Sequence, residues 1–132
     1  MSQKKVFNLE LPKTFCEIST FFSGGYLGEI SNYSFANVGN GINIIDETIR
    51  LRESVKLPAR FVALAETPES IIVMDTINRP SVIWFDAVEI SELENKSFTS
   101  KPDEWMTYAD YFKELHENDV YDILKVVLFM VS

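Results

Sequence analysis

Cysteine and histidine are almost absent from this sequence. Cys16 is the single cysteine and His116 the single histidine among 132 residues. One cysteine cannot form a disulfide within the chain, and it excludes a cysteine-cluster metal site. His116 lies beside Glu114 and Glu117, so we expect a solvated side chain on a charged helix. A Cys16–His116 nucleophile pair is the weaker interpretation, because a cysteine close to the apolar stripe of a short helix is usually a small core residue.

Long apolar runs and phosphate-binding loops are missing as well. The longest apolar run, residues 126–131, is far shorter than the roughly 20 residues that cross a bilayer. Residues 1–5 contain a basic pair but no apolar run of the ~7–15 residues that a secretory signal requires. The Gly39-Asn40-Gly41 turn is neither a Walker loop nor a GxGxxG motif. These absences predict a cytoplasmic protein with no membrane segment, no metal and no cofactor.

Acidic residues exceed basic ones, and the excess is uneven along the chain. The net charge is -8, from 20 acidic and 12 basic residues. Residues 1–60 contain seven basic and six acidic residues, whereas residues 61–132 contain five and fourteen. An acidic half disfavours nucleic-acid binding and favours a basic protein partner, because complementary fields raise association rates. The plainer alternative is that the acidic surface only keeps the protein soluble.

What the sequence does contain is a normal complement of core residues for one domain. Hydrophobic residues make up 46% and charged residues 24%, which is ordinary for a soluble globular chain of this length. Residues 61–65, 71–74 and 82–85 are three short apolar runs separated by turn formers, a pattern that predicts an antiparallel meander. Because each run is continuously apolar, we expect strands covered on both faces. Trp84, in the middle of the third run, is expected to be buried against a helix.

Helical periodicity flanks the predicted meander on both sides. A short helix over residues 11–22, with Pro12 in its first turn, would end at Gly24 or Gly25 in a left-handed conformation. We expect further helices over residues 46–54, over residues 108–117 with Thr107 as cap, and over residues 119–131 after a break at 118–119. The last of these is amphipathic, and its apolar end should be largely covered. Residues 33–36 are a strand candidate, and residues 89–104 read as a surface loop or a short helical turn.

Pairs of carboxylates are the remaining candidates for acid–base catalysis. Asp75 and Asp86 follow two strands that we expect to pair through a turn at residues 76–81. In an antiparallel hairpin the two strand ends lie at opposite ends of the ladder, so the pair cannot share a proton. Each aspartate is expected to accept hydrogen bonds from backbone amides of a turn instead. The sequence therefore predicts no enzymatic activity.

Five segments, in order, resemble the SUKH superfamily, which includes the yeast cell-wall assembly regulator and many bacterial immunity proteins. They are LPKTFCEISTFFSGG at residues 11–25, LPARFVALA at 57–65, IVMD at 72–75, VIWFD at 82–86 and YADYFKEL at 108–115. The resemblance covers about residues 9–117 of a chain read as one domain, residues 1–132. It departs from the family pattern at Glu69-Ser70, where the family often has Gly-Asp, and in the few residues before Leu11.

The resemblance implies an α+β domain, with a mostly antiparallel sheet flanked by helices, and a binding role. Many bacterial relatives are immunity proteins that bind a toxin domain, often a nuclease, and block it. A nuclease must be basic where it binds its substrate, which agrees with the acidic second half of this chain. The leading hypothesis is thus a cytoplasmic immunity protein or antitoxin that acts by occupancy. The alternative is a regulatory scaffold that binds host proteins.

Acidic side chains in the predicted turns and the long loop are the candidates for contacting a basic toxin domain. They share a position between apolar segments, where a carboxylate can face outward: Glu66, Glu69, Glu89, Glu92, Glu94, Asp103 and Glu104.

Overall fold

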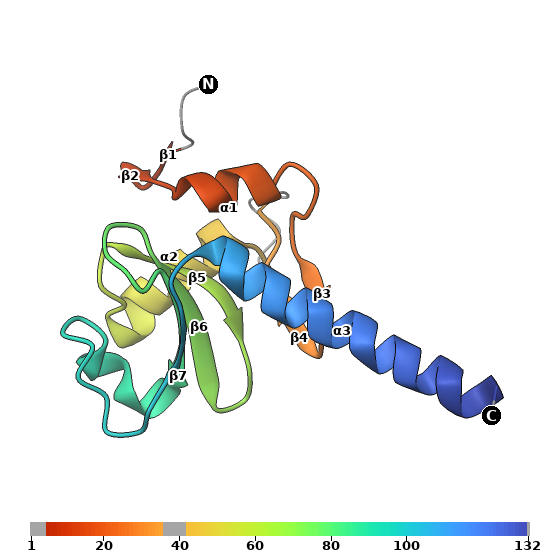
Figure 1. Cartoon of the computed structure of the whole chain (residues 1–132). Coiled ribbons are helices and arrows are strands. Elements are labelled where there is room, and N and C mark those ends of the chain that lie inside the picture. The colour runs from red at the N-terminus through yellow and green to blue at the C-terminus, as the bar shows by residue number, and fades with distance from the viewer. Residues whose placement is uncertain (1–4, 36–41, 132) are drawn as a thin grey trace.

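Six antiparallel strands form a curled sheet around which the described helices are arranged (Figure 1). A computed structural model describes residues 5–35 and 42–131. The strands lie in chain order and each pairs with its neighbour: β3 (Gly25–Leu27), β4 (Ile30–Asn32), β5 (Phe61–Glu66), β6 (Ser70–Asp75), β7 (Val82–Asp86) and β8 (Asp103–Trp105). The predicted α+β class and antiparallel sheet are confirmed.

The three central strands are covered on both faces, as their continuous apolar runs predicted. Successive side chains of a strand point to opposite faces. On β6, Ile72 and Met74 join the core beneath α1 (Lys13–Ile18) and α3 (Tyr108–Val131). Ile71 and Val73 join a second core with residues of α2 (Ile44–Val55) and of the segment that follows the 3₁₀ helix η1 (Ala87–Glu92). The meander is therefore the middle layer of the domain.

Helix α3 closes the curl of the sheet. Both edge strands, β3 and β8, contact it, although they lie at opposite ends of the strand order. Tyr111, which is fully buried, donates its hydroxyl to Asn32 Oδ1 on β4 at 2.7 Å. Tyr108 packs edge-on against Phe15 of α1, with ring centroids 4.8 Å apart. The apolar face of one helix thus ties α1 and the two edges of the sheet together.

The C-terminal part of the chain differs from its prediction. The break expected at residues 118–119 is absent, and α3 is one helix of 24 residues. Its second half extends beyond the sheet (Figure 1), so the expectation that its apolar end is largely covered is wrong for Leu128 and Met130, which are 65% and 76% exposed. Asn and Asp are only mildly unfavourable inside a helix, and continuation of the turns on both sides outweighs them. In the described part of the chain, no helix is long and apolar enough to cross a membrane.

The first two predicted helices are present with shifted ends. Helix α2 is longer than residues 46–54, because Asn43 rather than Asp46 caps it and accepts a hydrogen bond from Asp46 N at 2.9 Å. Helix α1 is shorter than residues 11–22 and ends at Ile18, where Ser19 keeps a right-handed conformation. The predicted glycine cap is therefore wrong. Thr107 does cap α3 through Asp110 N at 3.1 Å, as predicted.

Several strands were missed or misplaced by the sequence patterns. A two-stranded ladder, β1 (Lys5–Val6) with β2 (Leu9–Glu10), precedes α1. The strand expected over residues 33–36 lies instead at β4, and residue 36 falls outside the described residues. The segment 89–104 begins within η1, which agrees with the short helical turn, and it also contributes β8. Two- and three-residue strands are too short to show alternation in a sequence.

Gly24 and Gly25 have a role in the turn that leads into β3. Both have a positive φ, +117° and +110°, a conformation that side chains other than glycine rarely adopt. Only Gly24 is also enclosed, since a Cβ atom there would lie 2.6 Å from Ser34 Cα and 2.7 Å from Tyr33 O. A Cβ atom at Gly25 would meet nothing within 4 Å.

We expect Gly24→Ala to destabilise the domain more than Gly25→Ala. The backbone strain common to both substitutions costs about 1–3 kcal/mol, and the backbone clash at Gly24 adds about 1–3 kcal/mol more. Urea unfolding of the two variants beside the parent chain measures the difference. Equal losses from the two substitutions would contradict the close approach of residues 24 and 34.

Candidate protein-binding groove

Four of the seven predicted partner-binding carboxylates are already engaged within the domain. Glu66 accepts hydrogen bonds from the Tyr33 hydroxyl and the Arg50 guanidinium. Burial, together with the hydrogen bond from Tyr33 to Glu66, raises the pKa of the Tyr33 hydroxyl. Glu94 forms an ion pair with Arg60 at 3.0 Å. These two carboxylates link segments of the domain and are not free to receive a partner's cation.

The other two engaged carboxylates hold the segment between η1 and β8. Glu89 accepts hydrogen bonds from the backbone amides of Thr99 and Ser100, at 2.5 and 3.2 Å. Glu92 accepts from the Ser97 hydroxyl at 3.2 Å. Both side chains are half-buried. The acidic residues of this segment therefore serve to fix its conformation.

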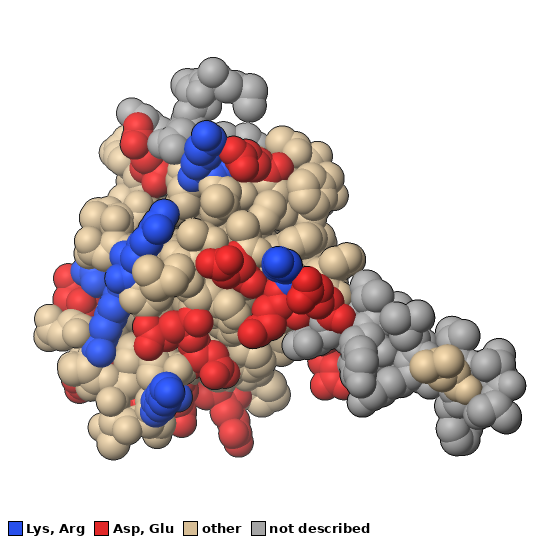
Figure 2. All heavy atoms as spheres, viewed as in Figure 1, with Lys and Arg blue, Asp and Glu red and all other residues tan. Residues whose placement is uncertain are grey.

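Glu69, Asp103 and Glu104 are different, because all three are exposed. Among residues 5–35 and 42–131, none of them forms an ion pair. Figure 2 shows acidic side chains gathered over the face along which the first half of α3 runs, with few basic side chains between them. Carboxylates that have no cation of their own are the ones available to a basic partner.

Asp103 lines a groove of about 350 Å³ between α3, the β3–β4 turn and strands β7 and β8. We name it the tryptophan groove and define it by Glu29, Trp84, Asp103, Trp105 and Glu114. No lysine or arginine is among the residues that line it. The groove exists because α3 closes the curled sheet near its two edges, which brings residues 27–30 beside β8.

Strand register places both tryptophans on the groove side of the sheet. Trp84 on β7 pairs with Asp103 on β8, and Val82 pairs with Trp105. Residues two apart on a strand share a face, so Trp84, Asp103 and Trp105 all project from the same side. Glu104, which pairs with Ile83, projects from the other side. Of the exposed predicted carboxylates, Asp103 thus belongs to the groove and Glu104 does not.

Hydrogen bonds fix the two indole rings. Trp84 Nε1 donates to Ser70 Oγ at 2.6 Å, and Trp105 Nε1 donates to Glu114 Oε2 at 2.9 Å. Trp105 also packs edge-on against Tyr111, with centroids 5.1 Å apart. Trp84 was predicted to be buried against a helix. It packs against the core beneath α1 and α3 but is only half-buried, because the groove and a second hollow open beside it.

A second hollow, of about 290 Å³, continues the acidic surface from the tryptophan groove. It shares Trp84 and Asp103 with the groove and is also lined by Glu69, Asp86 and Lys101. Glu69 and Asp103 were predicted as partner-binding residues from the sequence, but their proximity to each other was not. Glu29 and Glu114 were missed as groove residues. Glu29 is distant in sequence from β8, and Glu114, although only nine residues after Trp105, lies on another element, α3.

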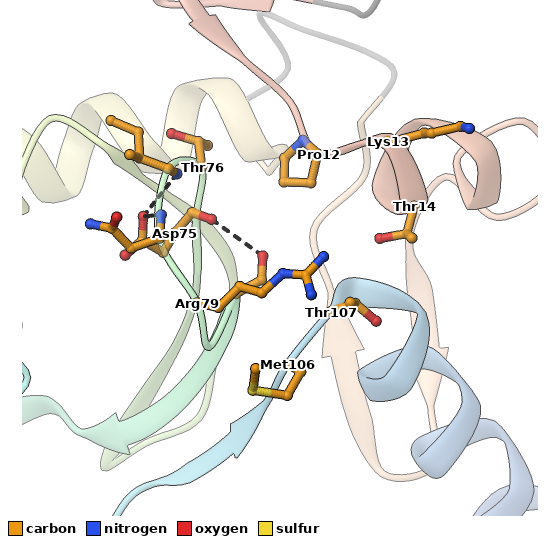
Figure 3. Close-up of a pocket in the computed structure, with 11 residues that line it drawn as sticks. Pro12, Lys13, Thr14, Asp75, Thr76, Arg79, Met106 and Thr107 are labelled. Carbon is orange, nitrogen blue, oxygen red and sulfur yellow. Dashed lines mark hydrogen bonds between the residues drawn. The ribbon is translucent and has the colours of Figure 1, made fainter.

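A smaller hollow of about 140 Å³ lies between the start of α1, the β6–β7 turn and the residues before α3. Figure 3 shows Arg79 directed into it from the turn, with Thr14 and Thr107 on the facing segments. Asp75 lies at its edge, and its carboxylate is occupied by contacts within the turn. Lys13, Asp75 and Arg79 are among its lining residues, but the Asp75 carboxylate is already held by turn amides and by Arg60 and Lys96.

Asp75 is the anchor of the β6–β7 turn. Its side chain is fully buried and accepts hydrogen bonds from the amides of Ile77 and Asn78, each at 2.9 Å. Arg60 and Lys96 form ion pairs with it, at 3.1 and 3.0 Å. Burial alone would raise the pKa of this carboxyl, but the two amide hydrogen bonds and the two cations outweigh it, and the pKa is lowered. The predicted turn hydrogen bonds are confirmed, whereas the buried ion pairs were not foreseen.

The other side chains that the sequence offered as catalytic candidates are Asp86, His116 and Cys16, and each has contacts typical of a structural or surface residue. Asp86 accepts a hydrogen bond from Val88 N at 3.1 Å and lies at the opposite end of the β6–β7 ladder from Asp75, as predicted. His116 is exposed and stacks on Phe112, with centroids 5.6 Å apart. Cys16 is partly buried and packs against the core beneath α1. Within the described ranges, no three His, Cys, Asp or Glu residues are grouped so as to hold a metal ion.

We expect Asp75→Asn to lower the free energy of unfolding at pH 7 by about 2–4 kcal/mol, because Arg60 and Lys96 lose the charge they share. The folded pKa of Asp75 is below the unfolded value, so its stabilisation is present above about pH 4 and is lost as pH falls through the folded pKa. The difference in free energy of unfolding between the parent chain and Asp75→Asn should therefore become smaller at acidic pH. Urea unfolding between pH 7 and pH 2 measures this difference.

Asp86→Asn is the matched control, since Asp86 is exposed and forms no ion pair with any described residue. It removes the same charge and should cost less than about 0.5 kcal/mol, because asparagine caps a helix about as well as aspartate. If the loss in free energy of unfolding caused by Asp75→Asn stayed constant with pH, this would contradict an ionised Asp75 as the anchor of the turn.

Comparison with known proteins found no match: no family model, no curated protein and no solved structure matches the chain.

Proposed function

We propose that this chain is a non-enzymatic protein-binding domain, a cytoplasmic immunity protein or antitoxin that binds and blocks a basic toxin domain. The observation that carries the proposal is the tryptophan groove with its continuation at Glu69 and Asp86. Three carboxylates and two half-buried tryptophans line the groove, and its lining contains no cation. Tryptophan is enriched at the centres of protein interfaces, and unpaired charge on one partner selects the opposite charge on the other.

The rigidity of the surface supports binding by occupancy. The groove is formed by paired strands, by a long helix and by indole rings that hydrogen bonds hold in place. A surface that is already ordered loses little conformational entropy on binding. The resemblance to SUKH immunity proteins independently suggests a toxin as the partner, and nucleases are common among such toxins.

Purification of the tagged chain from its native cells, followed by mass spectrometry, tests the proposal directly. One tightly bound, basic toxin domain supports it. Several housekeeping proteins in place of such a domain would favour the regulatory scaffold and would contradict the toxin assignment.

Association with the recovered partner should weaken with salt. We expect the association rate constant to fall roughly tenfold or more between 0.02 and 0.5 M salt, because the acidic surface steers a basic partner. Neutralising Glu69, Asp103 and Glu104 together (Glu69→Gln, Asp103→Asn, Glu104→Gln) should lower the rate and flatten its salt dependence. Stopped-flow fluorescence measures both quantities.

The matched control for this experiment neutralises three exposed carboxylates elsewhere: Glu10→Gln, Glu17→Gln and Glu53→Gln. Net charge changes equally in the two triple variants. An equal effect of both variants would show that total charge, and not the position of Glu69, Asp103 and Glu104, controls association.

Protection from the toxin should be stoichiometric. When the chain and the recovered toxin are co-expressed from separately titrated promoters, we expect growth only when the chain is at least equimolar to the toxin by quantitative immunoblot. Rescue at a strongly sub-stoichiometric level would indicate turnover and would overturn the non-enzymatic proposal.

A further inference from the structure

The tryptophan groove has the features of a site for a single planar cation. Trp84 and Trp105 line it together with Glu29, Asp103 and Glu114. Tryptophan is the aromatic residue that attracts a cation most strongly over its ring face, and the attraction grows as water is excluded. Carboxylates around the rings supply the opposite charge.

Hydrogen bonding leaves acceptor capacity in the groove. The Trp105 indole uses Oε2 of Glu114 at 2.9 Å, and Oε1 accepts no hydrogen bond from a described residue. Asp103 is exposed and accepts no side-chain hydrogen bond within the described chain. A carboxylate can accept two parallel N–H bonds from a guanidinium, whose planar shape also stacks on an aromatic ring. A lysine ammonium, as a hydrated point charge, matches only the charge.

We infer that the tryptophan groove receives an arginine side chain from the surface of the partner protein, packed against the indoles and paired with Asp103 and Glu114. The inference deepens the proposed function and rests on it for the partner's existence. A protein arginine fits better than a free small cation because the acidic surface does not end at the groove. It continues through Trp84 and Asp103 into the hollow at Glu69 and Asp86, which Lys101 also lines, and neighbouring residues of a protein segment would lie there.

The chain provides its own reporter for this contact. Trp84 and Trp105 are its only two tryptophans, and both line the groove. A ¹⁵N-labelled sample therefore gives two indole N–H resonances. The Trp105 signal reports on the groove, and the Trp84 signal reports on the boundary with the second hollow, where its N–H contacts Ser70. Titration with a tetra-arginine peptide should shift them saturably, the Trp105 signal most, because its N–H contacts Glu114. Tetra-citrulline, which has the same shape without the charge, should shift neither.

Isosteric charge removal locates the site. Asp103→Asn combined with Glu114→Gln retains an oxygen acceptor for the Trp105 indole and should weaken tetra-arginine binding roughly three- to tenfold, the range for two partly exposed charge pairs. The control Glu53→Gln with Glu10→Gln removes two exposed carboxylates away from the groove and should leave the dissociation constant unchanged. Tetra-lysine should bind more weakly than tetra-arginine to the parent chain.

Three results would overturn the inference: no saturable indole shift, equal weakening by the two double variants, or stronger binding of tetramethylammonium than of tetra-arginine, which would indicate a small-molecule site. Failure here is distinguishable from failure of the proposed function. If the recovered toxin binds the Asp103→Asn, Glu114→Gln variant as tightly as the parent chain, the arginine contact is wrong while the immunity role stands. If tetra-arginine binds as expected but no basic toxin co-purifies, the immunity role fails while the groove stands.

Discussion

Burial of both faces of β5, β6 and β7 is the constraint on which the rest of the structure depends. A sheet that is apolar on both sides needs a cover on both sides. Helices α1 and α3 cover one face, and α2 with the segment around Leu93 covers the other. The sheet curls, so one helix can contact both of its edges, and the contact between Tyr111 and Asn32 joins α3 to the sheet interior. The tryptophan groove lies at this closure, between α3, the β3–β4 turn and strands β7 and β8.

The acidic residues of the second half divide into two groups with different physical roles. Carboxylates that meet an arginine, a lysine or a backbone amide stabilise turns and the η1–β8 segment, as Asp75, Glu89 and Glu94 do. Carboxylates that meet none of these remain as net negative charge on the surface, as Asp103 and Glu69 do. Net charge alone cannot distinguish the two groups. The charge relevant to a partner is therefore smaller, and more localised, than the composition suggests.

Trp84 illustrates why the candidate site was only partly predictable. Its place in a run of four apolar residues is typical of core, and three of its neighbours in β7, Val82, Ile83 and Phe85, are indeed buried. Trp84 differs because the tryptophan groove and the second hollow open beside it, next to β8, which has only three residues, two of them exposed acids. Asp103 and Glu69 were identified from their positions in turns and loops. Glu29 comes from a distant part of the chain, and Glu114 is only nine residues from Trp105 but reaches it through the packing of α3 on the sheet, which no local pattern reveals.

Local chemistry in the sequence determined the central meander, the α+β class, the cap at Thr107 and the turn hydrogen bonds of Asp75, because each depends on residues within a few positions of one another. Short strands and helix ends were less predictable, since two or three residues carry no period. The continuity of α3 through Asn118 and Asp119 was decided by the turns on either side of those residues. Only the tertiary structure decided which carboxylates find an internal partner and which remain around two tryptophans, because that depends on how the sheet curls and where α3 closes it.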